Sequence, residues 1–135
     1  MPLVVQKYGG TSVADPERIR SVAENIARTR RHGNDVVVVV SAMGKETDEL
    51  IHLARQVSST LPGREMDMLL SVGERKTTAL LSMALHDLGV PAASFTGSQV
   101  GIVTDTDHQR AKILEIHGDR VRDALADGRV PVVAG

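Results

Sequence analysis

The sequence predicts an α/β sandwich built on a mostly parallel sheet. Apolar β-branched runs alternate along it with segments whose apolar residues recur at helical spacing. One of these runs is valine throughout, from residue 36 to residue 40. Such a continuous run is typical of a strand covered on both faces, as in parallel sheets. Alternation of strand and helix favours helices packed on that sheet.

The first elements are expected to be a buried strand at residues 3–7 and an amphipathic helix. Asp15 is a good N-cap and Pro16 suits the first helical position, so the helix is expected to begin there. Gly33 is expected to end it. Five apolar residues share one face of this helix: Ile19, Val22, Ala23, Ile26 and Ala27.

The following elements continue the alternation. After the strand Asp35–Val40, a helix is expected at residues 48–58, with four residues facing inward: Leu50, Ile51, Ala54 and Val57. Residues 64–88 are helical in pattern, with an interruption expected near Gly73. Residues 96–107 are rich in glycine and threonine and give no clear prediction. The remaining expected elements are strands Ala92–Phe95, Ile113–Ile116 and Val130–Ala134, and a short helix Asp119–Ala126.

The composition excludes several classes of protein. Of 135 residues, 1% are aromatic and the net charge is −1, which gives no support for nucleic acid binding. The absence of cysteine excludes disulfides and thiolate chemistry. No apolar run is long enough to span a bilayer, and no signal peptide precedes the first strand, so a cytoplasmic protein is expected. Because the chain ends on an apolar strand, we expect residues 1–135 to be a truncated domain.

The segment Lys7-Tyr8-Gly9-Gly10-Thr11-Ser12 follows the first expected strand. Ligands of open α/β sheets bind beyond the carboxyl ends of strands, and two glycines let backbone N–H groups approach a phosphate. An ordinary strand–turn–helix corner explains the same residues, so both readings stay open. The chain contains neither a Walker A loop nor a Gly-x-Gly-x-x-Gly fingerprint.

Three further segments carry polar groups. Ser41 and Thr47 follow the second strand, where Thr47 is either a helix N-cap or a ligand contact, and the cap is favoured for the residue alone. Glu74 can receive an ammonium group or be a solvated helix residue. The cluster of Asp105, Asp107 and His108 contains metal-ligand chemistry, but such clusters are more often polar turns, so no metal site is predicted.

In this order the motifs resemble those of aspartokinases, within the wider amino acid kinase family. The matching segments cover essentially the whole chain: Val5-Gln6-Lys7-Tyr8-Gly9-Gly10-Thr11-Ser12-Val13, Val40-Ser41-Ala42-Met43-Gly44, Thr47-Asp48-Glu49-Leu50, Arg64-Glu65-Met66-Asp67-Met68-Leu69-Leu70, Gly73-Glu74-Arg75, Ser94-Phe95-Thr96-Gly97-Ser98-Gln99, Gly101-Ile102 and Val132-Val133-Ala134-Gly135. The resemblance implies a three-layer α/β/α sandwich, of which residues 1–135 would form the N-terminal part of the catalytic domain.

The resemblance also implies an activity and a set of site residues. The activity is transfer of the ATP γ-phosphate to the side-chain carboxylate of L-aspartate, the first step toward lysine, threonine and methionine. Mg²⁺ would be bound through the ATP phosphates. Lys7 would be the catalytic cation. Lys7, Gly9 and Gly10 would contact the ATP phosphates, and Tyr8, Thr11 and Ser12 would complete the ATP-binding loop. L-Aspartate would contact Ser41, Thr47 and Glu74. The intact enzyme is expected to be a homo-oligomer.

The sequence departs from the family pattern at two positions. Glu46 stands where family members usually have the first threonine of Thr-Thr-Asp-Glu-Leu. After Gly73-Glu74-Arg75 the family prefers an apolar residue and then serine, whereas this chain has Lys76 and Thr77.

Two alternatives stand beside an aspartokinase. Another amino acid kinase, acting on glutamate, acetylglutamate or a nucleotide, would share the Lys7–Gly10 segment but not those around Met66 and Gln99. The second alternative is a catalytically incompetent fragment or ligand-binding half-domain. The resemblance places the adenine-binding half and the ACT regulatory domains beyond Gly135, so residues 1–135 alone are expected to lack ATP turnover and to leave a sheet edge unpaired.

Overall fold

The computed structural model describes residues 2–99, 102–104, 113–116 and 118–135. Four parallel strands form one sheet, in the order β1 (Leu3–Tyr8), β2 (Asp35–Val40), β6 (Val130–Ala134) and β3 (Ala92–Phe95). Two short strands, β4 (Ile102–Thr104) and β5 (Ile113–Ile116), pair antiparallel in a separate ribbon. The predicted parallel sheet and its four strand positions are confirmed.

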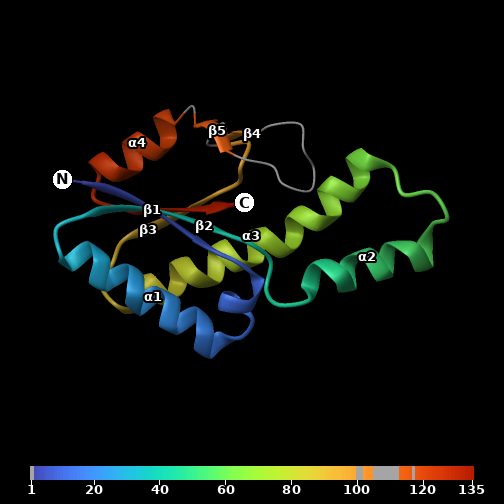
Figure 1. Ribbon diagram of the computed structural model, residues 1–135, viewed down its shortest axis with the longest axis horizontal. Coiled ribbons are helices and arrows are strands. Elements are labelled where there is room, and N and C mark those ends of the chain that lie inside the picture. Colours follow the sequence, from blue (N-terminus) through green and yellow to red (C-terminus); the bar gives the residue numbers. More distant parts are fainter. Residues whose placement is uncertain (1, 100–101, 105–112, 117) are drawn as a thin grey trace.

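Helices cover both faces of the four-stranded sheet (Figure 1). Helices α1 (Pro16–Arg31) and α3 (Gly63–Asp87) lie on one face, and α4 (Asp119–Ala126) lies on the other. The buried side chains accordingly form two clusters, one on each side of the sheet. This arrangement confirms the expected three-layer α/β/α sandwich.

The valine run forms the centre of the sheet. Because successive side chains of a strand point to opposite faces, Val36, Val38 and Val40 pack toward α1 and α3, while Val37 and Val39 pack toward α4. All five are buried. The sequence needs no alternation of polar and apolar residues here, because both faces of β2 are covered by helices.

Strand β1 differs from its prediction. It was expected to be buried, but its side chains alternate between exposed and half-buried, and Leu3 remains 56% exposed. The reason is its position at the edge of the sheet, where β2 is its one strand neighbour among the described residues. The exposed side chains of β1 lie on the face of the sheet opposite α1, where α4 does not cover them. The apolar composition of the strand could not predict this exposure.

Helix α1 forms as the sequence predicts. The side-chain Oδ1 of Asp15 accepts a hydrogen bond from the backbone N–H of Arg18 at 2.8 Å, which satisfies one unpaired donor of the first turn. Gly33 follows the last turn with a φ of +89°, a conformation that favours glycine. The five apolar residues predicted to face the core are buried.

Helix α2 (Glu46–Val57) and the first half of α3 extend away from the sheet as a hairpin (Figure 1). α2 begins two residues earlier than predicted and buries none of its residues. The expected inward position of Val57 is wrong, because this side chain is 82% exposed. A helix that packs against one other helix, and not against the sheet, covers only part of its apolar face.

Helix α3 runs without a break through Gly73, so the predicted interruption is wrong. The glycine permits close packing, since a Cβ at this position would lie 2.9 Å from the Cβ of Ala42.

Within the described residues, no helix is long and apolar enough to cross a membrane. The predicted polar turn at Asp105, Asp107 and His108 lies outside the described residues.

Candidate active site

The polar segments singled out in the sequence lie at one edge of the sheet. In the parallel registers, Tyr8 is opposite Val40, Val40 is opposite Ala134, and Phe95 is opposite Val133. The four strands therefore end together, and the loops that follow them share this edge. In an open α/β sheet, ligands bind beyond the carboxyl ends of the strands.

The loop after β1 has the close backbone packing that its glycines predict. Gly9 is extended, and a 3₁₀ turn (Gly10–Val13) follows it, with the N–H of Ser12 donating to the carbonyl of Gly9 at 3.0 Å. A Cβ on Gly10 would lie 3.0 Å from the carbonyl oxygen of Ala42, so a side chain would push the two loops apart. Backbone N–H groups in such a turn can approach a phosphate closely.

Lys7 and Tyr8 project to opposite faces of β1. Tyr8 packs against the buried cluster on the α1 side of the sheet, and period-two alternation places Lys7 on the other side. The Lys7 side chain is exposed. An exposed lysine at the end of a strand is accessible to an anionic ligand at this edge.

The Tyr8 hydroxyl is held by hydrogen bonds to neighbouring side chains. It donates to Oε1 of Gln6 at 2.9 Å and accepts from the side-chain amide of Asn25 on α1 at 2.7 Å. Gln6 in turn donates to Thr29 at 2.9 Å. Tyr8 thus fastens the end of β1 to α1. Sequence reasoning missed this network, because Asn25 is separated from Tyr8 by 17 positions and carries no motif.

The loop after β2 is tied to the loop after β1. The N–H of Ser41 donates to the carbonyl of Tyr8 at 3.2 Å, and the N–H of Gly44 donates to the carbonyl of Gly10 at 3.0 Å. Two backbone hydrogen bonds therefore join the two loops, and Ser41 is half-buried.

Thr47 is not the N-cap of α2. The helix begins at Glu46, its N-cap is Lys45, and no side chain caps its first N–H groups. The favoured capping reading of the threonine is therefore wrong. Its side chain is exposed in the first turn, which leaves the alternative that it contacts a ligand.

Helix α3 brings Gly73 against the loop after β2. The missing side chain of Gly73 lets Ala42 and the carboxylate arm of Glu46 lie directly on the helix. Glu74, the next residue, is half-buried, and desolvation raises the pKa of its carboxyl above the ordinary value of 4.5. A half-buried carboxylate with a perturbed pKa is a candidate functional group.

The two positions that depart from the family pattern are in contact. Nζ of Lys76 on α3 lies 2.8 Å from Oε2 of Glu46 at the start of α2. Neither residue alone suggests this pairing, since 30 positions separate them. A signal for it was nevertheless present in the sequence, because an acid and a base replace two uncharged residues of the pattern at the same time.

The loops that carry the predicted site residues contact one another through their backbones. The side chains of those residues do not form one closed cluster. Among the described residues, no hydrogen bond or ion pair links Lys7 to Ser41, Thr47 or Glu74. Nor do three or more His, Cys, Asp or Glu side chains in this part of the chain form a group suited to a metal ion. The arrangement can hold anionic groups on the first loop and a cationic group near Glu74.

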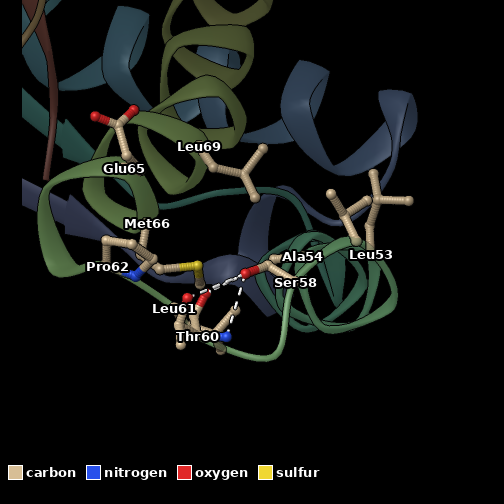
Figure 2. Close-up of a pocket in the computed structure, with 10 residues that line it drawn as sticks. Leu53, Ala54, Ser58, Thr60, Leu61, Pro62, Glu65, Met66 and Leu69 are labelled. Atoms are coloured by element: carbon tan, nitrogen blue, oxygen red, sulfur yellow. Dashed lines mark hydrogen bonds between the residues drawn. The ribbon is translucent and has the colours of Figure 1, made fainter.

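An apolar cavity of about 290 Å³ lies elsewhere, between α2 and α3 (Figure 2). Figure 2 shows Leu53, Met66 and Leu69 among the side chains that line it. Glu65 is its one charged lining residue. No Lys, Arg or His side chain lines this cavity to bind a phosphate, so the candidate site remains the edge of the sheet.

Gly73→Ala should destabilise the fold, although alanine normally favours a helix by about 1 kcal/mol over glycine. The added Cβ would meet Ala42, a buried loop residue that has no flexible side chain to move aside. We expect a loss of about 1 to 3 kcal/mol in the free energy of unfolding, measured by urea denaturation. Gly63→Ala in the same helix is the control, since its Cβ would meet nothing within 4 Å. Equal free energies of unfolding for Gly73→Ala and Gly63→Ala would contradict the close contact between Gly73 and Ala42.

Comparison with known proteins defines the class of protein that this fold and edge belong to. The sequence profile of the Amino acid kinase family matches residues 2–135, and the chain belongs to that family. It is 61% identical to an aspartokinase of Mycolicibacterium smegmatis and 56% identical to an aspartokinase of Corynebacterium glutamicum, in both cases over all of its 135 residues. The chain spans 32% of the length of each of these relatives.

Solved structures agree with the fold. The chain matches the crystal structure of aspartate kinase from Synechocystis with a TM-score of 0.83 and 54% identity, over 100% of this chain and 22% of that one. It also matches E. coli aspartokinase III, solved with aspartate and ADP, with a TM-score of 0.74 and 22% identity, over 100% of this chain and 40% of that one. At that identity the second match concerns the fold alone.

Proposed function

We propose that this chain supplies the phosphate loop and the acceptor site of an enzyme that transfers the γ-phosphate of ATP to the side-chain carboxylate of L-aspartate. The product would be 4-phospho-L-aspartate. The observation that carries the proposal is that the loop after β2 contacts both the glycine loop that Lys7 precedes and, at Gly73, the segment of α3 in which the half-buried carboxylate Glu74 follows. The aspartokinase names of the most similar relatives support the same acceptor.

The proposed reaction needs charge neutralisation and no general base. The side-chain carboxyl of aspartate has an unperturbed pKa of about 3.9, so it is already an anionic nucleophile at pH 7. It must approach an anionic γ-phosphoryl group, and positive charge and backbone N–H groups lower that barrier. Lys7, exposed at the end of β1, is the catalytic cation in this proposal, and the N–H groups of Gly9, Gly10 and Thr11 hold the phosphates.

Tyr8 has a positioning part in this proposal, because its hydroxyl is occupied by Gln6 and Asn25. Mg²⁺ fits the site as an ion that enters with ATP. The described residues offer phosphate-binding N–H groups and a lysine, but no cluster of carboxylates that would hold the ion by itself. When bound, Mg²⁺ would neutralise charge on the phosphates.

The acceptor would lie between the loop after β2 and helix α3. Glu74 receives the α-ammonium group of aspartate, which replaces the hydration that burial has removed from the carboxylate. Ser41 and Thr47 hold the carboxylates by hydroxyl donors. This binding mode selects for an amino acid with a free α-amino group, and so against acetylglutamate.

In this proposal residues 1–135 form the N-terminal part of the catalytic domain, and other residues of the gene product complete the nucleotide site. A cytoplasmic enzyme of amino-acid biosynthesis, acting on the route to lysine, threonine and methionine as a homo-oligomer, is part of the same proposal. The competing possibility is a non-catalytic binding unit, which would hold aspartate or ATP without turnover.

An acceptor panel tests the proposal. The complete gene product that contains residues 1–135 is assayed for ADP release with MgATP and L-aspartate, L-glutamate, N-acetylglutamate or UMP. We expect release that depends on L-aspartate and is at least about 100-fold slower with the other acceptors. Turnover with a different acceptor would replace the proposed substrate, and binding without turnover would favour the non-catalytic alternative.

A further inference from the structure

The ion pair between Glu46 and Lys76 joins the start of α2 to the middle of α3. Oε2 of Glu46 lies 2.8 Å from Nζ of Lys76, and the side chains are 17% and 49% exposed. Among the described residues it is the one ion pair that connects two different helices. Its place in the fold therefore differs from that of the surface pairs, which link neighbours within one turn.

The pair has unequal partners. The arm of Glu46 lies over Gly73, with Cγ and Cδ both 3.6 Å from the point where a Cβ on that glycine would be. Its Oε2 atom is shielded from solvent and has no hydrogen-bond partner of acceptable geometry among the described residues. The ammonium group of Lys76 is thus its close charge partner. Loss of the lysine would leave a partly shielded anion without its charge partner, which costs more than loss of both charges.

The residues beside the pair are those of the proposed acceptor site. Thr47 directly follows Glu46 in the first turn of α2, and Glu74 lies two positions before Lys76 on α3. No side chain caps the first turn of α2. An ion pair at the first residue is therefore a direct means of fixing that turn, and with it Thr47, against the segment of α3 that carries Glu74.

We propose that Glu46 and Lys76 are positioning residues whose ion pair sets the affinity of the acceptor site by holding the first turn of α2 against α3. The inference rests on the proposed function, because it concerns the aspartate site. Each of the two residues carries a charge that the other compensates. The pair acts on the geometry of acceptor binding and not on the phosphoryl group, so its effect falls on KM for aspartate.

The unequal burial of the two partners predicts how much each variant raises KM for aspartate. Lys76→Met leaves the shielded carboxylate without its partner and is expected to raise KM for aspartate about tenfold, with kcat changed less than about twofold. Glu46→Gln breaks the pair but leaves only a half-exposed lysine, which water can solvate, and is expected to raise KM about threefold. The double variant also lacks the pair but leaves no unpaired charge, so its KM should be raised about threefold and stay below that of Lys76→Met alone.

A double-mutant cycle in the complete gene product tests the inference. KM for aspartate and KM for ATP are measured for the parent, the two single variants and the double variant. Arg64→Met is the matched control, because it removes an exposed ion pair to Glu65 on the same helix and should change neither constant. KM for ATP should be unchanged throughout. A double variant whose KM equals the product of the two single effects would overturn the coupling, as would Lys76→Met with an unchanged KM.

Hydrogen–deuterium exchange separates this inference from the proposed function. Peptides covering α2 should exchange about tenfold faster in Lys76→Met than in the parent, and about threefold faster in the double variant, which lacks the pair but leaves no unpaired charge. If aspartate supports no turnover in the parent but the exchange pattern holds, the proposed function fails and the positioning of α2 stands. If turnover is found but exchange in α2 is the same in all variants, the positioning role is contradicted.

Discussion

Replacing Lys7 with alanine is expected to lower kcat by about 10²- to 10³-fold, with little effect on the stability of the fold. The lysine is exposed at the end of an edge strand, so the fold does not depend on its packing. Its charge matters most when the negative aspartate carboxylate and the γ-phosphoryl group come together. Because that interaction is strongest in the transition state, the loss should appear in kcat more than in either KM.

The measurement is steady-state ADP release at saturating ATP and aspartate, with urea denaturation to show that the variant is folded. Arg28→Ala, which removes an exposed cation from the last turn of α1, is the matched control and should keep the parent kcat. A decrease of less than about threefold in the Lys7 variant would remove Lys7 from the catalytic role.

Glu74→Gln is expected to raise KM for aspartate about 10- to 100-fold while kcat falls less. A charged hydrogen bond to an ammonium group contributes about 1.5 to 3 kcal/mol, and this contact is the same in the bound substrate and in the transition state. KM for ATP should not change, because the phosphates lie on the loop after β1. An unchanged KM for aspartate would exclude Glu74 from the acceptor site.

Glu74→Gln should not destabilise the protein at neutral pH. Burial raises the pKa of Glu74 above 4.5, so between that value and its raised pKa the folded state binds more protons than the unfolded state. Stability therefore falls as pH rises through this window, and above it the ionised carboxylate is a cost to the fold. Glutamine removes this cost, so the midpoint of thermal unfolding at pH 7 should stay equal or rise.

Thermal unfolding at several pH values checks the sign of this effect. The parent should lose stability relative to Glu74→Gln as the pH rises from about 4 to 7. A variant that is less stable than the parent at pH 7, with KM unchanged, would mean that Glu74 supports the fold and not the ligand. An unfavourable buried charge that improves binding is the pattern expected of a functional residue.

The sequence predicts the central part of the fold well because burial there is uniform. The valine run of β2 and the capped, amphipathic α1 follow from local residues alone, and both form as predicted. The exposure of Leu3 and Val57 could not be predicted in the same way. It depends on which strand lies at the sheet edge and on how far a hairpin extends from the sheet, and both are properties of the assembled layers.

Gly73 illustrates the limit of local reasoning most clearly. A glycine inside a helical pattern predicts a weak point, but the structure uses it for close packing against Ala42. The sequence also singled out the loops after β1 and β2 as candidates. Their hydrogen bonds to each other, Gly44 to Gly10 and Ser41 to Tyr8, depend on the parallel register of β1 and β2 and could not be predicted locally. The Glu46–Lys76 ion pair joins segments 30 residues apart, and only the tertiary structure brings them together.

The nature of the phosphorylated product tests the central claim most directly. The complete gene product that contains this chain is incubated with MgATP, L-aspartate and hydroxylamine, which converts an acyl phosphate into a stable hydroxamate. The proposed reaction predicts aspartate 4-hydroxamate in amounts equal to the ADP released. ADP release without hydroxamate, or a hydroxylamine-resistant phosphate ester as product, would contradict phosphoryl transfer to the side-chain carboxylate of aspartate.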